Sequence, residues 1–433
     1  MGIKSFLSNF SIKAGNIALS DSGNIQNLSP FQLTNLQHIT DLSPTNLVSL
    51  NSGWVAVCNG KNSATCSSIP LKLYYKNGTG KEPEVTQYRK LDSRTVENIC
   101  KSAHIELKKE DQIEEIIEHP ILTLFESINP TMNYNDWCEF NFEYMGLIGN
   151  SYNEIIYENN LPKELNPLLG EFVTPIATGR TQGKITGYLY KPDMKEARRF
   201  TPEQILHFAL YAPGNTLIGR GNLEVCISAQ ERYLYYDKFE KFLGINNNRP
   251  DWLLNLKAPK IAEKDLKDYY RQLNKRFGSV QNSGKPIIVA GDMDVKNLGF
   301  APRELQYQVG RQWSLKEIAG AFGIPEALVT VQDVNRANAV ESMNHYLRNT
   351  IYPMMVKYCG KINEVLVPLY DPNLFIWFEE QYLENPVEKV TNTISAYSAG
   401  IIDKNEARSA LGYEPVEEEA PIEDVKPEVV EEE

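Results

Sequence analysis

The sequence predicts an α+β protein that divides into two or more domains. At 433 residues the chain is too long for a single hydrophobic core. Short runs with strand-like character dominate residues 166–208, whereas other segments repeat apolar residues every three or four positions, as helices do. Hydrophobic residues make up 42% of the chain and charged residues 23%, which is the composition of an ordinary soluble protein.

The first half of the chain predicts a mixture of helices and strands. Residues 1–50 are rich in Asn, Ser, Thr and Leu without a sustained period, so we expect an irregular arm with one short helix. A helix over 54–69 then leads into a strand over 69–74 that is entered through Pro70. The next expected elements are a helix that begins at His119-Pro120, a helix over 137–148, a strand over 154–157 and strands over 172–174 and 185–190.

The second half predicts longer helices around a small module. Residues 222–243 have the apolar face of a helix, and residues 248–300 read as a compact α/β module with strands over 252–256 and 286–290 and a helix over 262–277. A further helix must end at Gly323 and Pro325, because glycine closes a helix and proline forbids its continuation.

A last long helix begins near Ala337. Its apolar residues are spaced by three or four and form one stripe: Val340, Met343, Leu347, Ile351, Met355, Tyr358, Ile362 and Val365. Pro353 lies inside this stripe, and we therefore expect the helix to be kinked.

The negative charge of the chain is concentrated at its C-terminal end. Of the formal charge of −12, residues 414–433 supply −9 through ten acidic residues and one basic residue, which leaves −3 for residues 1–413. A nearly neutral body is a poor candidate for tight, sequence-specific binding to DNA phosphates, but it suits a surface past which DNA moves. We expect the acidic tail to be disordered.

No pattern in the sequence indicates catalysis, a cofactor or a bound metal. The glycines of Gly219-Arg220-Gly221 precede a helix, but a dinucleotide fingerprint would need a third glycine at position 224, which is Glu224, so we expect a tight turn. His207 lies between two apolar residues and is expected in the core or at a strand edge. The cysteines lack metal-ligand spacing and are expected to be reduced and mostly buried: Cys58, Cys66, Cys100, Cys138, Cys226 and Cys359.

The chain also lacks the signals of membrane insertion or secretion. No apolar run approaches the roughly 18 residues of a membrane span, and the first residues contain neither an apolar segment nor a signal cleavage site. We expect no membrane partner.

A series of short motifs resembles the HK97-type portal proteins of tailed bacteriophages. Each match alone is weak, but about ten occur in the family's order over more than 300 residues. The matching stretches are Ile69-Pro70-Leu71-Lys72-Leu73-Tyr74, His119-Pro120-Ile121-Leu122, Asn129-Pro130, Gly149-Asn150-Ser151-Tyr152, Ile205-Leu206-His207, Gly219, Asn246-Asn247-Asn248-Arg249-Pro250, Gly284-Lys285-Pro286, Ile318-Ala319, Phe322-Gly323-Ile324-Pro325, Asn405-Glu406-Ala407-Arg408 and Leu411-Gly412-Tyr413-Glu414-Pro415.

This resemblance implies a structural protein, not an enzyme, that forms a ring of identical subunits, typically twelve, at one vertex of the capsid. DNA would enter and leave through the axial channel. The implied division is an N-terminal arm and wing over 1–221, a first stem helix over 222–243, a clip over 244–302, a second stem helix over 303–323, a tunnel loop over 324–337, a kinked wing helix and strand over 338–384, a crown of short helices over 385–413 and an acidic tail over 414–433.

The resemblance also implies sites and partners. Five polar residues would face DNA in the channel: Gln332, Asp333, Asn335, Arg336 and Asn338. Three residues of the clip would dock partner proteins: Arg249, Trp252 and Lys285. The implied partners are double-stranded DNA passing non-specifically, terminase, a head-completion or adaptor protein, and the major capsid and scaffold proteins. The protein would be assembled in the bacterial cytoplasm and carried in the virion.

Two other classes of function stay open at this point. One is an enzyme with an unrecognised active site, against which the absence of a P-loop, a metal cluster or a nucleophile–base constellation argues. The other is an interaction scaffold that forms no ring, which ring assembly would exclude.

Overall fold

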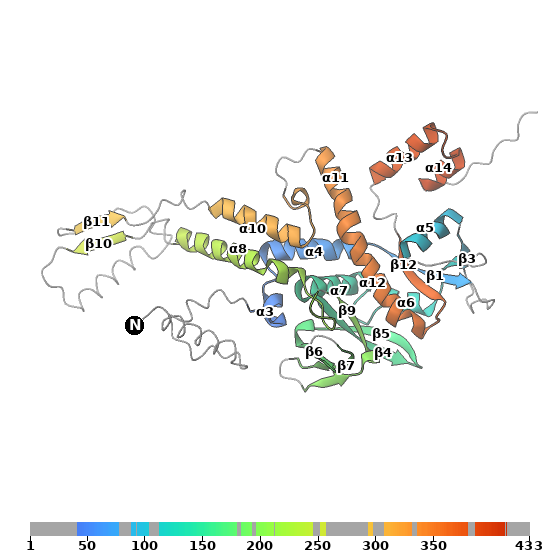
Figure 1. Cartoon of the computed structure of the whole chain (residues 1–433), viewed down its shortest axis with the longest axis horizontal. Coiled ribbons are helices and arrows are strands. Elements are labelled where there is room, and N and C mark those ends of the chain that lie inside the picture. The colour runs from blue at the N-terminus through green and yellow to red at the C-terminus, as the bar shows by residue number, and fades with distance from the viewer. Residues whose placement is uncertain are drawn as a thin grey trace, which may run out of the picture. The chain divides into compact units, whose positions relative to one another are not determined.

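The computed structural model describes residues 41–77, 88–91, 93–103, 112–179, 183–192, 196–211, 213–245, 252–256, 293–297, 307–330, 336–379, 386–411 and 413 (Figure 1). The chain separates into two compact units, Met1–Ser43 and Pro44–Glu433, and every element below belongs to the second. Most of the predicted arm, the tail after Tyr413 and the predicted 262–277 helix and 286–290 strand lie outside the described residues.

The larger core is built around two helices that pack on each other, α4 (Gly53–Ser67) and α7 (Tyr134–Ile148). Asn133 and Asp136 form a reciprocal capping box that starts α7, and Gly149 ends it with a left-handed φ of 76°. Trp137 and Phe142 of α7 are fully buried. The shorter helices α3 (Pro44–Ser49), α5 (Ser93–Ala103) and α6 (Pro120–Glu126) belong to the same part of the chain.

A four-stranded antiparallel sheet contributes to this core. Its strands lie in the order β12 (Leu374–Phe378), β1 (Leu71–Asn77), β3 (Gln112–Ile116) and β2 (Tyr88–Lys90). The outer edge of β12 is covered by the side chain of Asn363. Its amide donates to the carbonyl of Ile376 at 2.8 Å and its carbonyl accepts from the same residue's N–H at 2.7 Å. These bonds satisfy backbone groups that a buried sheet edge would leave unpaired.

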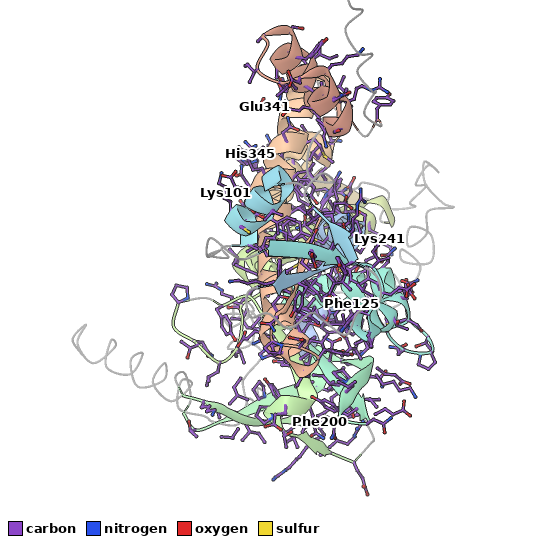
Figure 2. All side chains as sticks on the ribbon, turned by 90° about the vertical axis from the view of Figure 1, so that its right-hand side faces the viewer. Lys101, Phe125, Phe200, Lys241, Glu341 and His345 are labelled. Carbon is purple, nitrogen blue, oxygen red and sulfur yellow. The ribbon has the colours of Figure 1, made fainter. Side chains whose placement is uncertain are left out.

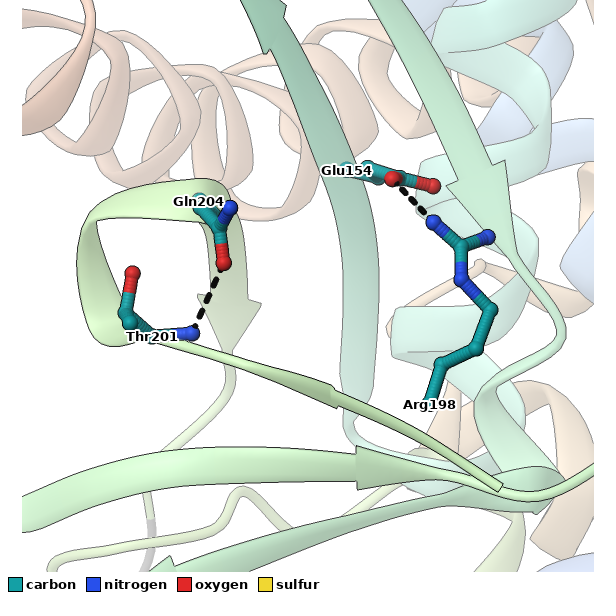
Figure 3. A network of polar contacts seen from close by, with 4 residues as sticks. All are labelled: Glu154, Arg198, Thr201 and Gln204. Atoms are coloured by element: carbon teal, nitrogen blue, oxygen red, sulfur yellow. Dashed lines mark hydrogen bonds and ion pairs between the residues drawn. The ribbon is translucent and has the colours of Figure 1, made fainter. Parts of the chain in front are cut away.

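A smaller core lies between two three-stranded sheets, β5–β4–β9 and β6–β7–β8. Their strands are β4 (Asn150–Glu158), β5 (Leu161–Leu168), β6 (Val173–Ala177), β7 (Ile185–Tyr190), β8 (Arg198–Phe200) and β9 (Ile205–Ala209). Figure 2 shows the two cores apart, with Phe125 in the larger and Phe200 in the smaller. Arg198 of β8 pairs with Glu154 of β4 at 2.5 Å, and Thr201 and Gln204 cap the turn η3 (Pro202–Gln204) that joins β8 to β9 (Figure 3).

The remaining elements begin with the helix α8 (Asn222–Ile245). This helix packs against α10 (Tyr307–Ala321). Between them lies a two-stranded antiparallel ribbon, β10 (Trp252–Leu256) and β11 (Met293–Asn297). After α10 come the short turn η6 (Glu326–Leu328) and the helical segments α11 (Arg336–Tyr346), η7 (Leu347–Ile351), α12 (Tyr352–Val365) and η8 (Val367–Leu369), and the described chain ends with α13 (Pro386–Ser398) and α14 (Lys404–Ala410).

The expected kink in the last long helix takes the form of a π-helical segment. η7 interrupts the α-helical pattern directly before Pro353, where the proline ring would clash with the carbonyl of an unbroken helix. The predicted stripe is buried from Leu347 to Ile362, but Met343 is 37% exposed. Burial of this stripe therefore begins at Leu347, the first residue of η7.

Local details agree with several of the sequence interpretations. All six cysteines are free and buried. His207 is buried, stacks on Tyr152 and shares hydrogen bonds with Asn150 and Tyr188 at 3.1 and 3.3 Å. The strand expected over 154–157 begins earlier, at Asn150, and the charged stretch 82–118 contains β2, α5 and β3, which the sequence did not predict.

The glycines before α8 serve backbone packing. A Cβ on Gly219 would lie 2.1 Å from the carbonyl oxygen of Gly149, and one on Gly221 would lie 2.2 Å from that of Leu147. Glu224, at the position that the dinucleotide fingerprint reserves for glycine, forms an ion pair with Arg220 at 3.0 Å. This is the tight turn that the sequence predicted.

Candidate functional site

The helices α8 and α10 lie side by side and are joined by charged pairs (Figure 1). Arg311 reaches Glu240 at 2.6 Å and Asp237 at 3.5 Å. Arg232 reaches Glu317 at 2.5 Å and the hydroxyl of Ser314 at 3.2 Å. These partly exposed pairs add little stability individually, but together they fix the register of the two helices.

A glycine permits the close approach of these helices. A Cβ on Gly310 would lie 2.7 Å from a ring atom of Tyr236, so the aromatic ring lies directly against the α10 backbone. The guanidinium of Arg311 lies over the ring of Tyr233, 5.4 Å from its centroid. The described parts of α8 and α10 therefore form a fixed hairpin.

The end of α10 is shaped by Gly323. Its φ of +70° and the bond from the N–H of Ile324 to the carbonyl of Ala319, at 2.9 Å, close the helix in the manner of a Schellman motif. The hydroxyl of Thr350, in the π-helical segment, donates to the carbonyl of Gly323 at 2.6 Å. This bond ties the end of α10 to the kinked helix.

One buried asparagine of α4 holds both ends of the segment that follows. The amide of Asn62 donates to the carbonyl of Phe322 at 2.9 Å, and its carbonyl accepts from the hydroxyl of Tyr346 at 2.9 Å. Burial raises the pKa of Tyr346, so its hydroxyl remains a donor. The neighbouring Lys61 donates to the carbonyl of Leu328 at 2.9 Å. The same side chain thus contacts the end of α10 at Phe322 and the end of α11 at Tyr346.

The structure places only part of the predicted channel segment. Arg336 begins α11, and Asn338 lies exposed in its first turn. The other three predicted channel residues lie outside the described residues: Gln332, Asp333 and Asn335.

The structure describes only one of the three predicted docking residues of the clip. Trp252 begins β10 and is paired in register with Asn297 of β11. Arg249 and Lys285 lie outside the described residues. The described chain therefore brings no two of these three residues together.

The residues that anchor the segment were not predicted. Asn62 is a poor helix former in the middle of a predicted helix, and that position was the available signal. Tyr346 directly precedes Leu347 of the predicted stripe and is itself fully buried. The hydrogen bonds of these two residues span more than 250 positions of sequence, which a local pattern cannot indicate.

Two classes of site receive no support from the parts of the chain that the structure describes. Across these ranges, no group of three or more His, Cys, Asp or Glu side chains is arranged to hold a metal ion. Within them, no helix combines the length and the hydropathy needed to cross a membrane.

Comparisons with known proteins agree with this architecture. The chain is 24% identical over 332 residues to an uncharacterized protein of Rickettsia bellii. This similarity covers 74% of this chain and 85% of that protein. Two solved structures of the gene transfer agent (GTA) neck are similar at 19% identity and cover 86% of this chain. They are the neck of an empty particle computed with C6 symmetry, with a TM-score of 0.59 and 94% of that chain covered, and the neck of a native particle computed with C12 symmetry, with a TM-score of 0.58 and 95% covered.

A sequence model of the family described as "Phage portal protein" matches residues 93–412, which is most of the chain. The matched range includes the α8–α10 hairpin and the anchored segment between α10 and α11. The chain belongs to the phage portal protein family.

Proposed function

We propose that identical copies of this chain close into a ring, typically of twelve, at one vertex of a phage-like particle, and that double-stranded DNA passes through the axial channel. The family match over residues 93–412 is the observation that carries this proposal. The C6 and C12 symmetries named for the two similar neck structures support a cyclic assembly. In this role the protein is a structural conduit of the virion, and ATP hydrolysis belongs to the terminase that docks on it.

The segment over 324–337 is proposed to face the channel. Its support is the anchor at Asn62, which holds the chain before the segment at Phe322 and after the segment at Tyr346. Polar residues of mixed charge suit this position, because many tight phosphate contacts would stall DNA. The proposed DNA-facing residues are Gln332, Asp333, Asn335, Arg336 and Asn338.

The exposed apolar face of α13 also supports assembly. Val390, Ile394 and Tyr397 are 43%, 54% and 48% exposed, and their spacing of four and three places them on one side of the helix. Apolar residues grouped in this way usually mark an interaction surface. In the proposed ring this helix belongs to the crown, where copies of α13 approach one another.

The ribbon of β10 and β11 is proposed to meet other head proteins. A two-stranded ribbon is marginal by itself and gains stability when another chain or copy packs against it. Terminase would bind here during packaging and a head-completion or adaptor protein afterwards, through Arg249, Trp252 and Lys285. The major capsid and scaffold proteins would surround the ring, and assembly would take place in the bacterial cytoplasm before the ring enters the virion.

Light scattering on the purified full-length protein tests the assembly. Twelve copies of the 49.2 kDa chain have a mass of about 590 kDa, and we expect a species near this value at micromolar concentration. A single species at the mass of one chain, over a range of salt concentrations, would overturn the proposal.

A further inference from the structure

One side of α10 is exposed although it carries large apolar residues. Val309 is 45% exposed and Trp313 is 61% exposed. Lys316 lies over the indole ring of Trp313, 5.6 Å from its centroid, and Gly320 would have nothing within 4 Å of an added Cβ. The spacing of four, three and four residues places all of them on one side of the helix, which we call the Trp313 stripe.

The stripe combines a projecting side chain with an open position. An exposed tryptophan offers a large contact area at low entropic cost, and residues of this type dominate the energetics of protein interfaces. Gly320, two turns further along, leaves room for a partner's side chain or backbone to approach closely. The geometry is that of a helix face that another helix can cover.

Among the described residues, α8 and α4 pack on the other sides of α10, and the stripe stays exposed. A closed ring of more than two copies joins unlike faces, so the stripe must meet a different surface of the next copy. On α8, Tyr235 is 63% exposed, and the exposed Lys238 lies one turn away on the same side. Among the side chains that the structure describes, each helix of the hairpin thus carries an exposed aromatic residue, Tyr235 on α8 and Trp313 on α10.

The charged pairs of the hairpin place these two aromatic residues at one level. Arg311 lies beside Asp237, and Arg232 lies beside Ser314, so in the antiparallel hairpin Trp313 is level with Tyr235. Rotation about an axis parallel to the hairpin preserves height along that axis. In a ring with such an axis, Trp313 of one copy is level with Tyr235 of the next.

We propose that the Trp313 stripe of each copy packs against the Tyr235 side of α8 in the neighbouring copy. This inference rests on the proposed ring and names the surfaces that close it. Val309 and Lys238 also lie at one height along the hairpin, so in this ring Val309 of one copy lies opposite Lys238 of the next.

Cross-linking between two variants that each add one cysteine tests the pairing without removing either aromatic residue. The variants are Val309→Cys and Lys238→Cys, each assembled alone and then as a mixture, and treated with a bifunctional maleimide of about 10 Å reach. The six native cysteines are buried, and burial raises the pKa of Cys58 to about 11, so they compete poorly for the reagent.

We expect a cross-linked dimer from the mixture and none from either variant alone. A ring of the expected mass that gives no cross-link in the mixture overturns this inference and leaves the proposed function standing. A dimer from Val309→Cys alone also overturns it, because like faces would then meet. A wild-type protein that stays monomeric overturns both.

A substitution supplies the second readout. We expect Trp313→Ser to raise the protein concentration needed for half-assembly at least tenfold, with unchanged circular dichroism. The matched control Tyr211→Ser, at a residue that is 59% exposed and lies outside the hairpin, should change it less than twofold. Equal effects of the two substitutions would contradict the assignment.

Discussion

Replacing Asn62 by leucine should loosen at once the two points, Phe322 and Tyr346, that flank the proposed channel segment. The substitution keeps the approximate volume of the side chain but removes the donor to Phe322 and the acceptor for Tyr346. The carbonyl of Phe322 would then lack this donor, and the hydroxyl of Tyr346 would keep only its longer contacts to the carbonyl of Lys61 at 3.4 Å and the hydroxyl of Thr65 at 3.3 Å. Since a buried unsatisfied group costs about 1–3 kcal/mol, we expect a loss of about 1–3 kcal/mol in the free energy of unfolding.

The companion variant Tyr346→Phe isolates one of the two bonds. It removes the hydroxyl and leaves the carbonyl oxygen of Asn62 without this donor, so we expect a loss of about 1–3 kcal/mol. Because both substitutions remove the same hydrogen bond, the double variant should be less destabilised than the sum of the single variants.

Urea denaturation followed by tryptophan fluorescence measures these losses. All variants must be compared at one protein concentration, because assembly makes the apparent stability depend on concentration. If the free energy of unfolding of the Asn62→Leu variant lies within about 0.5 kcal/mol of the wild-type value, the anchor contributes too little for the proposed role. Strict additivity in the double variant would show that the two side chains do not share a bond in solution.

Three further predictions concern other parts of the chain. Burial lowers the pKa of His207 from 6.5 to about 3, so the neutral ring stabilises the fold above pH 6.5 and this contribution is lost as the pH falls toward 3. At pH 5 this lowers the free energy of unfolding by about 2 kcal/mol. Urea titrations at pH 7 and pH 5 measure the loss, and a wild-type protein that loses no more stability than the His207→Gln variant would refute the prediction. Gly219→Ala should lower the free energy of unfolding by several kcal/mol, because the added Cβ would meet backbone atoms. The control Gly360→Ala should raise it by about 0.5–1 kcal/mol, because its Cβ would meet nothing within 4 Å. Equal melting temperatures of the two variants would contradict this contrast. Changing Asp333 and Arg336 together to alanine should leave rings intact on light scattering while lowering the DNA packaged or retained, because charges repeated around a constriction alter the potential at each phosphate; loss of rings would make the segment an interface.

Elements governed by short-range patterns could be predicted from the sequence. The helix that became α4, the stop at Gly323 and the kink near Pro353 each depend on residues within one or two turns. Proline and glycine act locally, through missing donors and through φ, so their effects are visible without knowledge of distant contacts.

Elements governed by distant partners could not be predicted. β12 pairs with β1 across about 300 residues, and its outer edge is covered by Asn363, whose bonds to Ile376 have no signature in the sequence. The strand that pairs with β10 is Met293–Asn297, where the sequence predicted no strand. An alternating pattern shows that a strand is possible, but the choice of partner and register depends on packing.

The candidate site shows the same division. The resemblance implied a channel segment between two helices, and the structure has α10 and α11 on either side of the residues named for it, whose role stays a prediction. The anchoring residues Asn62, Tyr346 and Thr350 come from helices far apart in the sequence, and only the fold brings them together. The exposed Trp313 is likewise recognisable as an interface residue only once the other sides of α10 are seen to be occupied.

Electron microscopy of the purified wild-type protein tests the central proposal most directly, because end-on views report both closure of the ring and the presence of a channel. We predict closed rings with a central hole and one dominant rotational symmetry, with twelve copies expected. Particles that never close, or closed particles without an axial channel, would contradict the assignment of this chain as a DNA conduit.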